Sequence, residues 1–305
     1  MNTTLYAVRK FLAMLFVGVL FFGVQPNGAP AHTVLDEENC RLNAFVASDA
    51  HIEGNQFERL TNFGRMLYDI KNTKRGNDAI VFLGDNTMNG QHIENMLFFG
   101  ALTKVSPAEN TLVMLGNHDV GNGAGSFKEL SDRYMAYNSI FLDEKLEKPY
   151  RFKIINGYYF IMLSTESSTS NEMDISDEQL TFLRETMDAA TADGKPVFVF
   201  NHYPLDWEIG DKQYAISSLL GEYKNVFYFY GHMHSALNIS SVTKYNNIRC
   251  ISVPMFTSIN KEDATGEDTG VGFALEVYDD SVAVRARDCY DGKWLDSYSF
   301  SFPLD

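Results

Sequence analysis

The sequence is poor in cysteine, which limits the kinds of protein it can encode. It has three cysteines in 305 residues: Cys40, Cys250 and Cys289. Three cysteines cannot form the framework of a disulfide scaffold, and no pair has the C-x-x-C spacing of a redox centre. Cys250 and Cys289 both lie in predicted C-terminal strands, so they are candidates for a disulfide in an oxidising compartment. The pairing of the three cysteines remains open.

Positive charge is also scarce. The chain has 25 lysines and arginines against 40 aspartates and glutamates, which gives a net charge of −15. Such an acidic surface argues against nucleic acid or an anionic membrane as a dedicated partner. If the substrate is anionic, positive charge has to be supplied locally, and metal ions would supply it.

Internal repeats, low-complexity runs and long linkers rich in proline, glycine or serine are absent too. The chain is 45% hydrophobic and 13% aromatic, which is enough for one large core. We therefore expect a single domain over residues 32–305. The sequence leaves the oligomeric state open.

One long apolar run lies near the N-terminus, from Phe11 to Val24, directly after Arg9 and Lys10. With the small-x-small site at residues 29–31, it predicts a signal peptide over residues 1–31. The run is shorter than the roughly 20 residues of a membrane span. An uncleaved N-terminal anchor is the alternative, and only then do we expect stable membrane association. In both cases the folded part is expected to be secreted, periplasmic or at the cell surface.

After residue 31, short apolar runs alternate with amphipathic segments. The predicted strands of this part are 43–48, 79–83, 111–115, 197–200 and 225–230, with a hairpin at 151–162. Capping boxes at Ser126 and Ser176 predict two of the helix starts. From residue 249 onward the pattern is β only. The alternation predicts an α/β fold with a largely parallel sheet, and the C-terminal strands are expected to complete a second sheet packed on it.

Five of these strands end in a small residue together with Asp, Asn or His. The strand ends read Asp49-Ala50-His51, Gly84-Asp85, Gly116-Asn117-His118-Asp119, Asn201-His202 and Gly231-His232-Met233-His234. The carboxyl edge of a parallel sheet is where α/β proteins place their sites. Five of the seven histidines lie at these positions, so we expect their side chains to converge.

These side chains form a mixed nitrogen and oxygen ligand set. Such a set suits Zn, Mn, Fe(II) or Co rather than Ca or a soft metal. It is too large for one tetrahedral zinc but sufficient for two ions that share a carboxylate. Taken singly, Asp85 is more simply a helix cap, Asn117 a turn residue and His202 a core histidine. Their joint occurrence favours the metal site.

In this order the five motifs resemble those of the calcineurin-like metallophosphoesterases. The resemblance implies two packed mixed sheets flanked by helices, a four-layer αββα sandwich, with two divalent metal ions. It assigns Asp49, His51 and His234 to one ion, and Asp85 to a bridge between both ions. It assigns Asn117, His202 and His232 to the other ion.

The resemblance also implies the reaction. Two ions clamp the phosphoryl oxygens and lower the pKa of a bridging water, and the resulting hydroxide attacks phosphorus in line. His118 resembles the leaving-group acid or phosphate-binding histidine, and Asp119 would orient it. The alternative is an exported binding or adhesion module that keeps the metals without turnover. A metallopeptidase is disfavoured because no H-E-x-x-H motif occurs.

Departures from the family's patterns narrow the substrate. The loop "GDNTMNG" (84–90) lacks the second Asp and the Arg of the protein Ser/Thr phosphatases. Met88 stands where purple acid phosphatases carry their iron-binding tyrosine. A small-molecule phosphoester is therefore the expected substrate, either a monoester or a diester. In the protein phosphatases this arginine binds the dianionic monoester, so its absence here slightly favours a diester.

Overall fold

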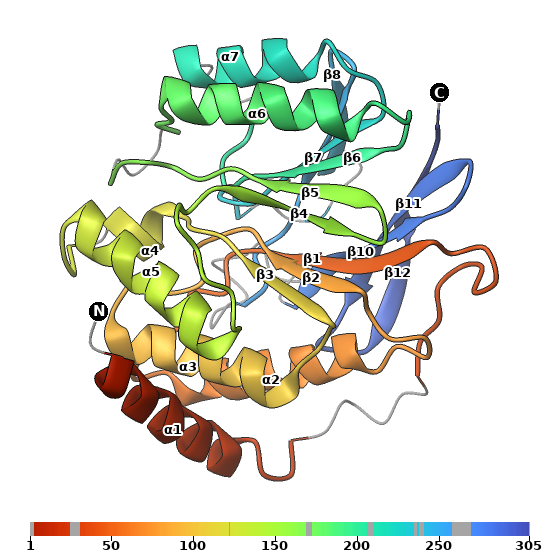
Figure 1. Ribbon diagram of the computed structural model, residues 1–305. Coiled ribbons are helices and arrows are strands. Elements are labelled where there is room, and N and C mark those ends of the chain that lie inside the picture. Colours follow the sequence, from red (N-terminus) through yellow and green to blue (C-terminus); the bar gives the residue numbers. More distant parts are fainter. Residues whose placement is uncertain are drawn as a thin grey trace.

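The protein is described here by a computed structural model that covers residues 3–24, 31–121, 123–168, 173–205, 210–234, 237, 241–257 and 270–304. Two six-stranded sheets pack face to face, and helices cover the outer face of each (Figure 1). The predicted four-layer αββα arrangement is confirmed.

The first sheet is built around three parallel strands that continue into an antiparallel extension. Its strands, in sheet order, are β12 (Lys293–Pro303), β11 (Ser281–Asp288), β10 (Val271–Val277), β1 (Leu42–Ala47), β2 (Ala79–Phe82) and β3 (Asn110–Val113). Strand β10 pairs antiparallel with β1, with Phe45 opposite Ala274.

The second sheet has four parallel strands between two antiparallel edge strands. Its strands, in sheet order, are β4 (Arg151–Ile155), β5 (Tyr158–Met162), β6 (Val197–Phe200), β7 (Val226–Tyr230), β9 (Ile248–Ser252) and β8 (Val242–Tyr245). The turn between β4 and β5 contains Asn156 and Gly157, both with positive φ, as a tight hairpin requires.

The helices lie outside the two sheets. They are α1 (Thr3–Leu20), α2 (Phe57–Lys71), α3 (His92–Val105), α4 (Asn117–Gly121), α5 (Phe127–Phe141), α6 (Asp177–Ala190) and α7 (Asp211–Leu220). The capping box at Ser126 is present in full. Ser176 caps α6 from its side chain, but the Gln179 side chain pairs with the backbone of Ser164 instead. No helix in the described ranges is long and apolar enough to cross a membrane.

Three apolar layers hold these elements together. Side chains such as Val46, Val81, Phe160 and Phe229 fill the space between the sheets. A second layer joins the first sheet to α2, α3 and α5, and a third joins the second sheet to α6 and α7. Strands β1, β2, β6 and β7 are therefore buried on both faces, which explains their unbroken apolar runs.

Three expectations were wrong or incomplete. Strands β10, β11 and β12 extend the first sheet and do not complete the second, because β10 pairs with β1. Strand β8 and helix α4 were not predicted, since both are short and lack a clear hydrophobic period.

Cys250 and Cys289 are both free and buried. Cys250 lies in a strand of the second sheet, whereas Cys289 follows a strand of the first.

Candidate metal centre

The predicted ligands lie on loops that leave the strands in an unusual backbone conformation. Ten residues other than glycine have positive φ in the described part of the chain. Half of them are predicted ligands: Asp49, His51, Asp85, His232 and His234. A non-glycine residue held there costs on the order of 1–3 kcal/mol and persists only where its surroundings enforce it. This concentration of strain is typical of a functional site.

Backbone contacts between neighbouring loops enforce this conformation. The His51 amide donates to Asp85 O at 2.8 Å, and the Ile52 amide donates to Asn86 O at 2.9 Å. Both continue the β1–β2 ladder beyond the strands. The buried Arg59 side chain also donates to His51 O at 2.6 Å.

Two glycines let the loops approach one another. A methyl group on Gly231 would overlap Ser48 Oγ and lie 2.5 Å from Asp49 Oδ2. A methyl group on Gly116 would overlap Asp85 Oδ1. Neither position admits a side chain without moving a predicted ligand, which explains the glycine before each of these motifs.

The structure brings the seven predicted ligands together in two groups that share Asp85. In the first group, His234 Nε2 lies 3.2 Å from Asp49 Oδ1 and 3.1 Å from His51 Nε2. His51 Nε2 lies 3.7 Å from Asp85 Oδ2. Asp49, His51 and Asp85 are buried, and His234 is the partly exposed member of the group.

The second group is centred on the amide of Asn117, at the start of α4. His202 Nε2 lies 3.0 Å from Asn117 Oδ1 and 3.3 Å from Asp85 Oδ2. His232 Nδ1 lies 2.9 Å from the same Asn117 oxygen. The two groups divide the residues in the way the resemblance implies, and the ion that each residue ligates stays a prediction.

Imidazoles balance the buried carboxylates. Burial favours the uncharged acid at Asp49, but the nearby His234 and His51 imidazoles outweigh it and hold the pKa of Asp49 well below its usual range. Burial also opposes a charge on His202, yet the negative charge of Asp85 raises the His202 pKa to about 9. The acids are thus ionised and His202 is protonated at neutral pH. Bound divalent cations would displace such protons.

The donor atoms fit a pair of divalent cations. Asp49 Oδ1 is buried and accepts no hydrogen bond of acceptable geometry, whereas buried carboxylate oxygens normally have a partner. It faces two imidazole nitrogens that lie only 3.1 Å apart. Carboxylate, imidazole and amide donors around a shared carboxylate are the ligand set of borderline divalent metals.

His118 lies against the first group. Its ring meets the His51 ring edge-on, with centroids 4.6 Å apart, and its Nδ1 lies 3.0 Å from Met88 O. That contact assigns the Nδ1 proton and leaves Nε2 as the nitrogen that can exchange a proton with a substrate. No sequence pattern indicates this contact, because a backbone carbonyl makes it.

The contacts of Asp119 differ from those expected of a residue that orients His118. Its carboxylate accepts five hydrogen bonds, from Asn86, Thr87 and the Gly116 amide. Burial and the nearby charge of Asp85 raise its pKa. These bonds tie the loop after β2 to the loop after β3, so Asp119 positions both loops, and Met88 O orients His118.

Two aromatic residues follow His202 closely in the sequence and are candidates for contact with substrate. Tyr203 is fully buried, and its ring packs on those of His202 and His232 at centroid distances of 5.3 and 5.0 Å. It therefore supports the second group from behind. Trp207 lies outside the described residues.

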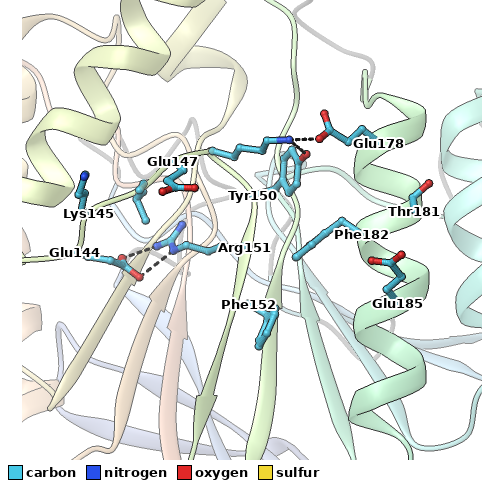
Figure 2. A pocket seen from close by; sticks show the side chains of 12 residues that line it. Glu144, Lys145, Glu147, Tyr150, Arg151, Phe152, Glu178, Thr181, Phe182 and Glu185 are labelled. Atoms are coloured by element: carbon cyan, nitrogen blue, oxygen red, sulfur yellow. Dashed lines mark hydrogen bonds and ion pairs between the residues drawn. The ribbon is translucent and has the colours of Figure 1, made fainter.

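A large surface pocket of about 670 Å³ lies elsewhere, between α6 and the segment that joins α5 to β4 (Figure 2). None of the predicted ligands is among the residues that line it. Arg151 forms a two-bond pair with Glu144 at 2.9 and 3.0 Å, and Lys148 donates to Glu178 and Tyr150. Three cations line the pocket, the third being Lys145, but four glutamates line it as well, so it is a poor place for an anionic phosphoester.

Comparison with known proteins agrees with this geometry. The model of the calcineurin-like phosphoesterase family matches residues 42–236, which is more than half of the chain. No curated protein matches the chain.

Solved structures share the fold at low sequence identity. A dimetal phosphatase from Danio rerio has a TM-score of 0.61 at 13% identity, over 88% of this chain and 100% of that one. A purple acid phosphatase from yellow lupin (Lupinus luteus) seeds has a TM-score of 0.60 at 13% identity, over 91% of this chain and 55% of that one. The family match, with two residue groups suited to divalent cations, settles the class. The chain belongs to the calcineurin-like phosphoesterase family and is a binuclear metallophosphoesterase, a hydrolase that uses two divalent metal ions.

Proposed function

We propose that the protein is an exported hydrolase of small-molecule phosphoesters, and that phosphodiesters are its preferred substrates. The observation that carries the proposal is the convergence of seven donor residues from five strand ends around Asp85. A chain with 40 acidic residues gains from such a site the positive charge that attracts an anionic ester.

Asp49, His51 and His234 would hold one ion and Asn117, His202 and His232 the other, with Asp85 between them. When bound, the ions act as Lewis acids on the phosphoryl oxygens. The protein keeps the ligands in place through strained loops and through the five hydrogen bonds of Asp119. Its part is thus mainly to position and to pre-organise.

His118 is the side chain that we assign to proton transfer. With Nδ1–H held by Met88 O, a proton on Nε2 can pass to the leaving oxygen of the ester. The loop between β2 and α3 has Met88 and Asn89 where protein phosphatases have Asp and Arg. A monoester dianion therefore lacks its usual arginine partner here, which favours a diester with a single negative charge.

Export is proposed from the N-terminal segment. Arg9 and Lys10, the apolar run from Phe11 and the small residues at 29–31 support it. Most of that last stretch lies outside the described residues. Cleavage after Ala31 and retention leave products that differ by 31 residues, which intact mass distinguishes.

The test is hydrolysis of bis-p-nitrophenyl phosphate and p-nitrophenyl phosphate by the full chain with Mn²⁺. Asp85→Asn should abolish both activities. Asp143→Asn is the matched control, because Asp143 also has positive φ (55° against 49°) but is exposed outside the site. A faster reaction with the monoester would overturn the diester preference. A folded wild type that binds Mn²⁺ and hydrolyses neither would favour a binding module.

A further inference from the structure

Helix α1 packs on the enzyme with features that a discarded segment does not need. It lies outside the α2–α3 layer (Figure 1) and contacts α3 and α5. Ala13, Val17 and Phe21, spaced by four residues, are at most 3% exposed. Tyr6 meets Tyr137 edge-on with centroids 5.3 Å apart.

Polar contacts add to this packing. The Arg9 guanidinium lies 2.8 Å from His92 Nδ1, and Lys10 Nζ donates to Ile140 O at 2.5 Å. The two cations of the N-terminal segment therefore face the body of the enzyme. They fix the direction in which α1 lies across α3 and α5.

The surface beneath α1 is shaped to receive it. Gly64 and Gly100 lie inside α2 and α3, where glycine costs about 1 kcal/mol relative to alanine. A methyl group on Gly100 would lie 3.3 Å from Ala13 and Val17, and one on Gly64 would overlap the Phe21 ring. Both glycines let α1 approach closely. The packing gained in this way can offset the helix-propensity cost of the glycines only if the mature protein keeps α1.

The opposite side of α1 is apolar as well. Fourteen large hydrophobic side chains are exposed in the described residues. Eight of them belong to α1 or the turn that follows it, and Phe57 and Ile93 border the groove beside the helix. We call these ten residues the apolar face: Leu5, Val8, Phe11, Leu12, Leu15, Phe16, Val19, Phe22, Phe57 and Ile93. Val19 is 71% exposed and Phe22 is 92% exposed. A cluster of this kind marks an interaction surface.

The chemistry of the apolar face selects a hydrocarbon partner. Its ten side chains consist of carbon and hydrogen only, and no charged residue occurs between Phe11 and Leu35. A protein interface of ordinary kind has about one hydrogen bond per 100–200 Å², and this face offers no side-chain donor or acceptor for one. A hydrocarbon partner neither offers nor requires hydrogen bonds. The backbone groups of the helix do not need them either, because they are paired within the helix.

We propose that α1 is retained in the mature enzyme and that the apolar face binds the surface of a lipid bilayer. The helix lies flat on the enzyme through Ala13, Val17 and Phe21, and it enters the acyl region of one leaflet through Leu15, Val19 and Phe22. This goes beyond the proposed reaction, since either ester class could be hydrolysed by an enzyme held in this way.

The apolar face also reaches the loops of the metal centre. A groove of about 510 Å³ runs between α1 and α3 and is bordered by Gly54, Phe57 and Ile93. Gly54 follows His51 by three residues, so their Cα atoms lie within about 11 Å. Binding through this face would therefore bring the metal centre close to the bilayer surface.

Two measurements on the full chain test retention and docking. Intact mass should give the whole 34.5 kDa chain after expression with an active export pathway. Hydrogen exchange in lipid-free buffer should show amides 11–20 protected to the level of α3. A mature chain that begins at His32, or exchange of these amides at the rate of an unfolded peptide, would overturn the proposal.

Flotation with phosphatidylcholine vesicles tests the partner. The triple variant Leu15→Ser, Val19→Ser, Phe22→Ser should lower vesicle binding by about a thousandfold or more, because burial of each apolar side chain is worth about one factor of ten or more. Phe152→Ser with Ile154→Ser, an exposed pair on β4, should leave it unchanged. Hydrolysis of the soluble ester should stay the same in both, which separates this test from that of the reaction. Equal binding by the triple variant, or a lipid-free dimer that the triple variant abolishes while vesicles bind nothing, would contradict a lipid partner.

Discussion

Two regions of this enzyme bury charged side chains, and they do so in opposite ways. Behind the first sheet, Asp69 pairs with Arg287 through two hydrogen bonds of 2.6 Å, and Glu276 pairs with Arg285 at 2.6 Å. The Trp294 ring lies over both guanidinium groups, with its centroid 4.9 Å from the Cζ atom of Arg287 and 3.8 Å from that of Arg285. Each charge there has its complement within the chain.

At the metal centre the complement is incomplete. Carboxylates face imidazoles at 3.2–3.7 Å, one buried carboxylate oxygen accepts no hydrogen bond, and five donors have positive φ. A buried charge needs a partner, so the first region is complete as folded and the second is built for added cations. Both regions bury charged side chains, so burial does not distinguish them. The distances and geometry of the ion pairs do.

The same substitution in the two regions should separate activity from stability. Asp85→Asn removes the carboxylate shared by both groups, and with it several kcal/mol of transition-state stabilisation by the ions. We expect kcat/KM to fall by about a thousandfold or more. The midpoint of urea unfolding should fall only modestly, because His202 can release its proton when the charge of Asp85 is lost, whereas a buried arginine would stay charged. A large loss of stability with activity intact would reverse the roles of the regions.

Asp69→Asn is the converse. It leaves Arg287 buried without its carboxylate, and breaking a buried pair in this way costs about 3–5 kcal/mol. The free energy of unfolding should fall by that amount, while kcat per folded molecule stays within about twofold. Urea unfolding and active-site-normalised kinetics measure the two quantities. Unchanged stability would show that the Asp69–Arg287 pair contributes as little as a surface pair does.

Added metal should stabilise the protein against unfolding only through the metal centre. At a free Mn²⁺ concentration 100 times the dissociation constant, binding to the native state adds about 2.7 kcal/mol to the unfolding free energy. We expect this gain in the wild type and in Asp69→Asn, but not in Asp85→Asn. Thermal unfolding with Mn²⁺ and with EDTA provides the measurement. An equal gain in Asp85→Asn would place the bound metal elsewhere.

The contrast also explains what could and could not be predicted from the sequence. The metal-centre residues follow apolar runs at regular places, so their convergence was predictable from strand ends alone. The Asp69–Arg287 pair joins residues 218 positions apart and depends on β10 and β11 joining the first sheet, which the pattern did not reveal. The contact of Met88 O with His118 and the loop contacts of Asp119 were hidden for another reason, because hydrogen bonds to backbone and loop groups leave no periodic trace.

The smallest expected effect concerns pH and belongs to the ion-pair region. His32 Nε2 lies 3.0 Å from Asp69 O, and its ring meets Trp294 edge-on at 5.4 Å. Burial, and then the positive charge of Arg287, lower the His32 pKa from 6.5 to about 4. Because the folded pKa lies below the unfolded one, the native state is penalised when His32 is protonated. Its contribution to stability is full above about pH 6.5 and is lost as the pH falls towards 4.

Since the His32 ring is partly exposed, we expect solvent to reduce the effect to about 1 kcal/mol between pH 7 and pH 5. Urea unfolding of the full chain at both pH values should show this difference between the wild type and His32→Gln, in which the contribution is absent. The comparison of the two proteins cancels the titration of the metal ligands, which both retain. If wild type and His32→Gln lose the same stability on acidification, the Asp69–Arg287 region accommodates a protonated His32 without cost. The neighbouring ion pair would then not be what keeps His32 neutral.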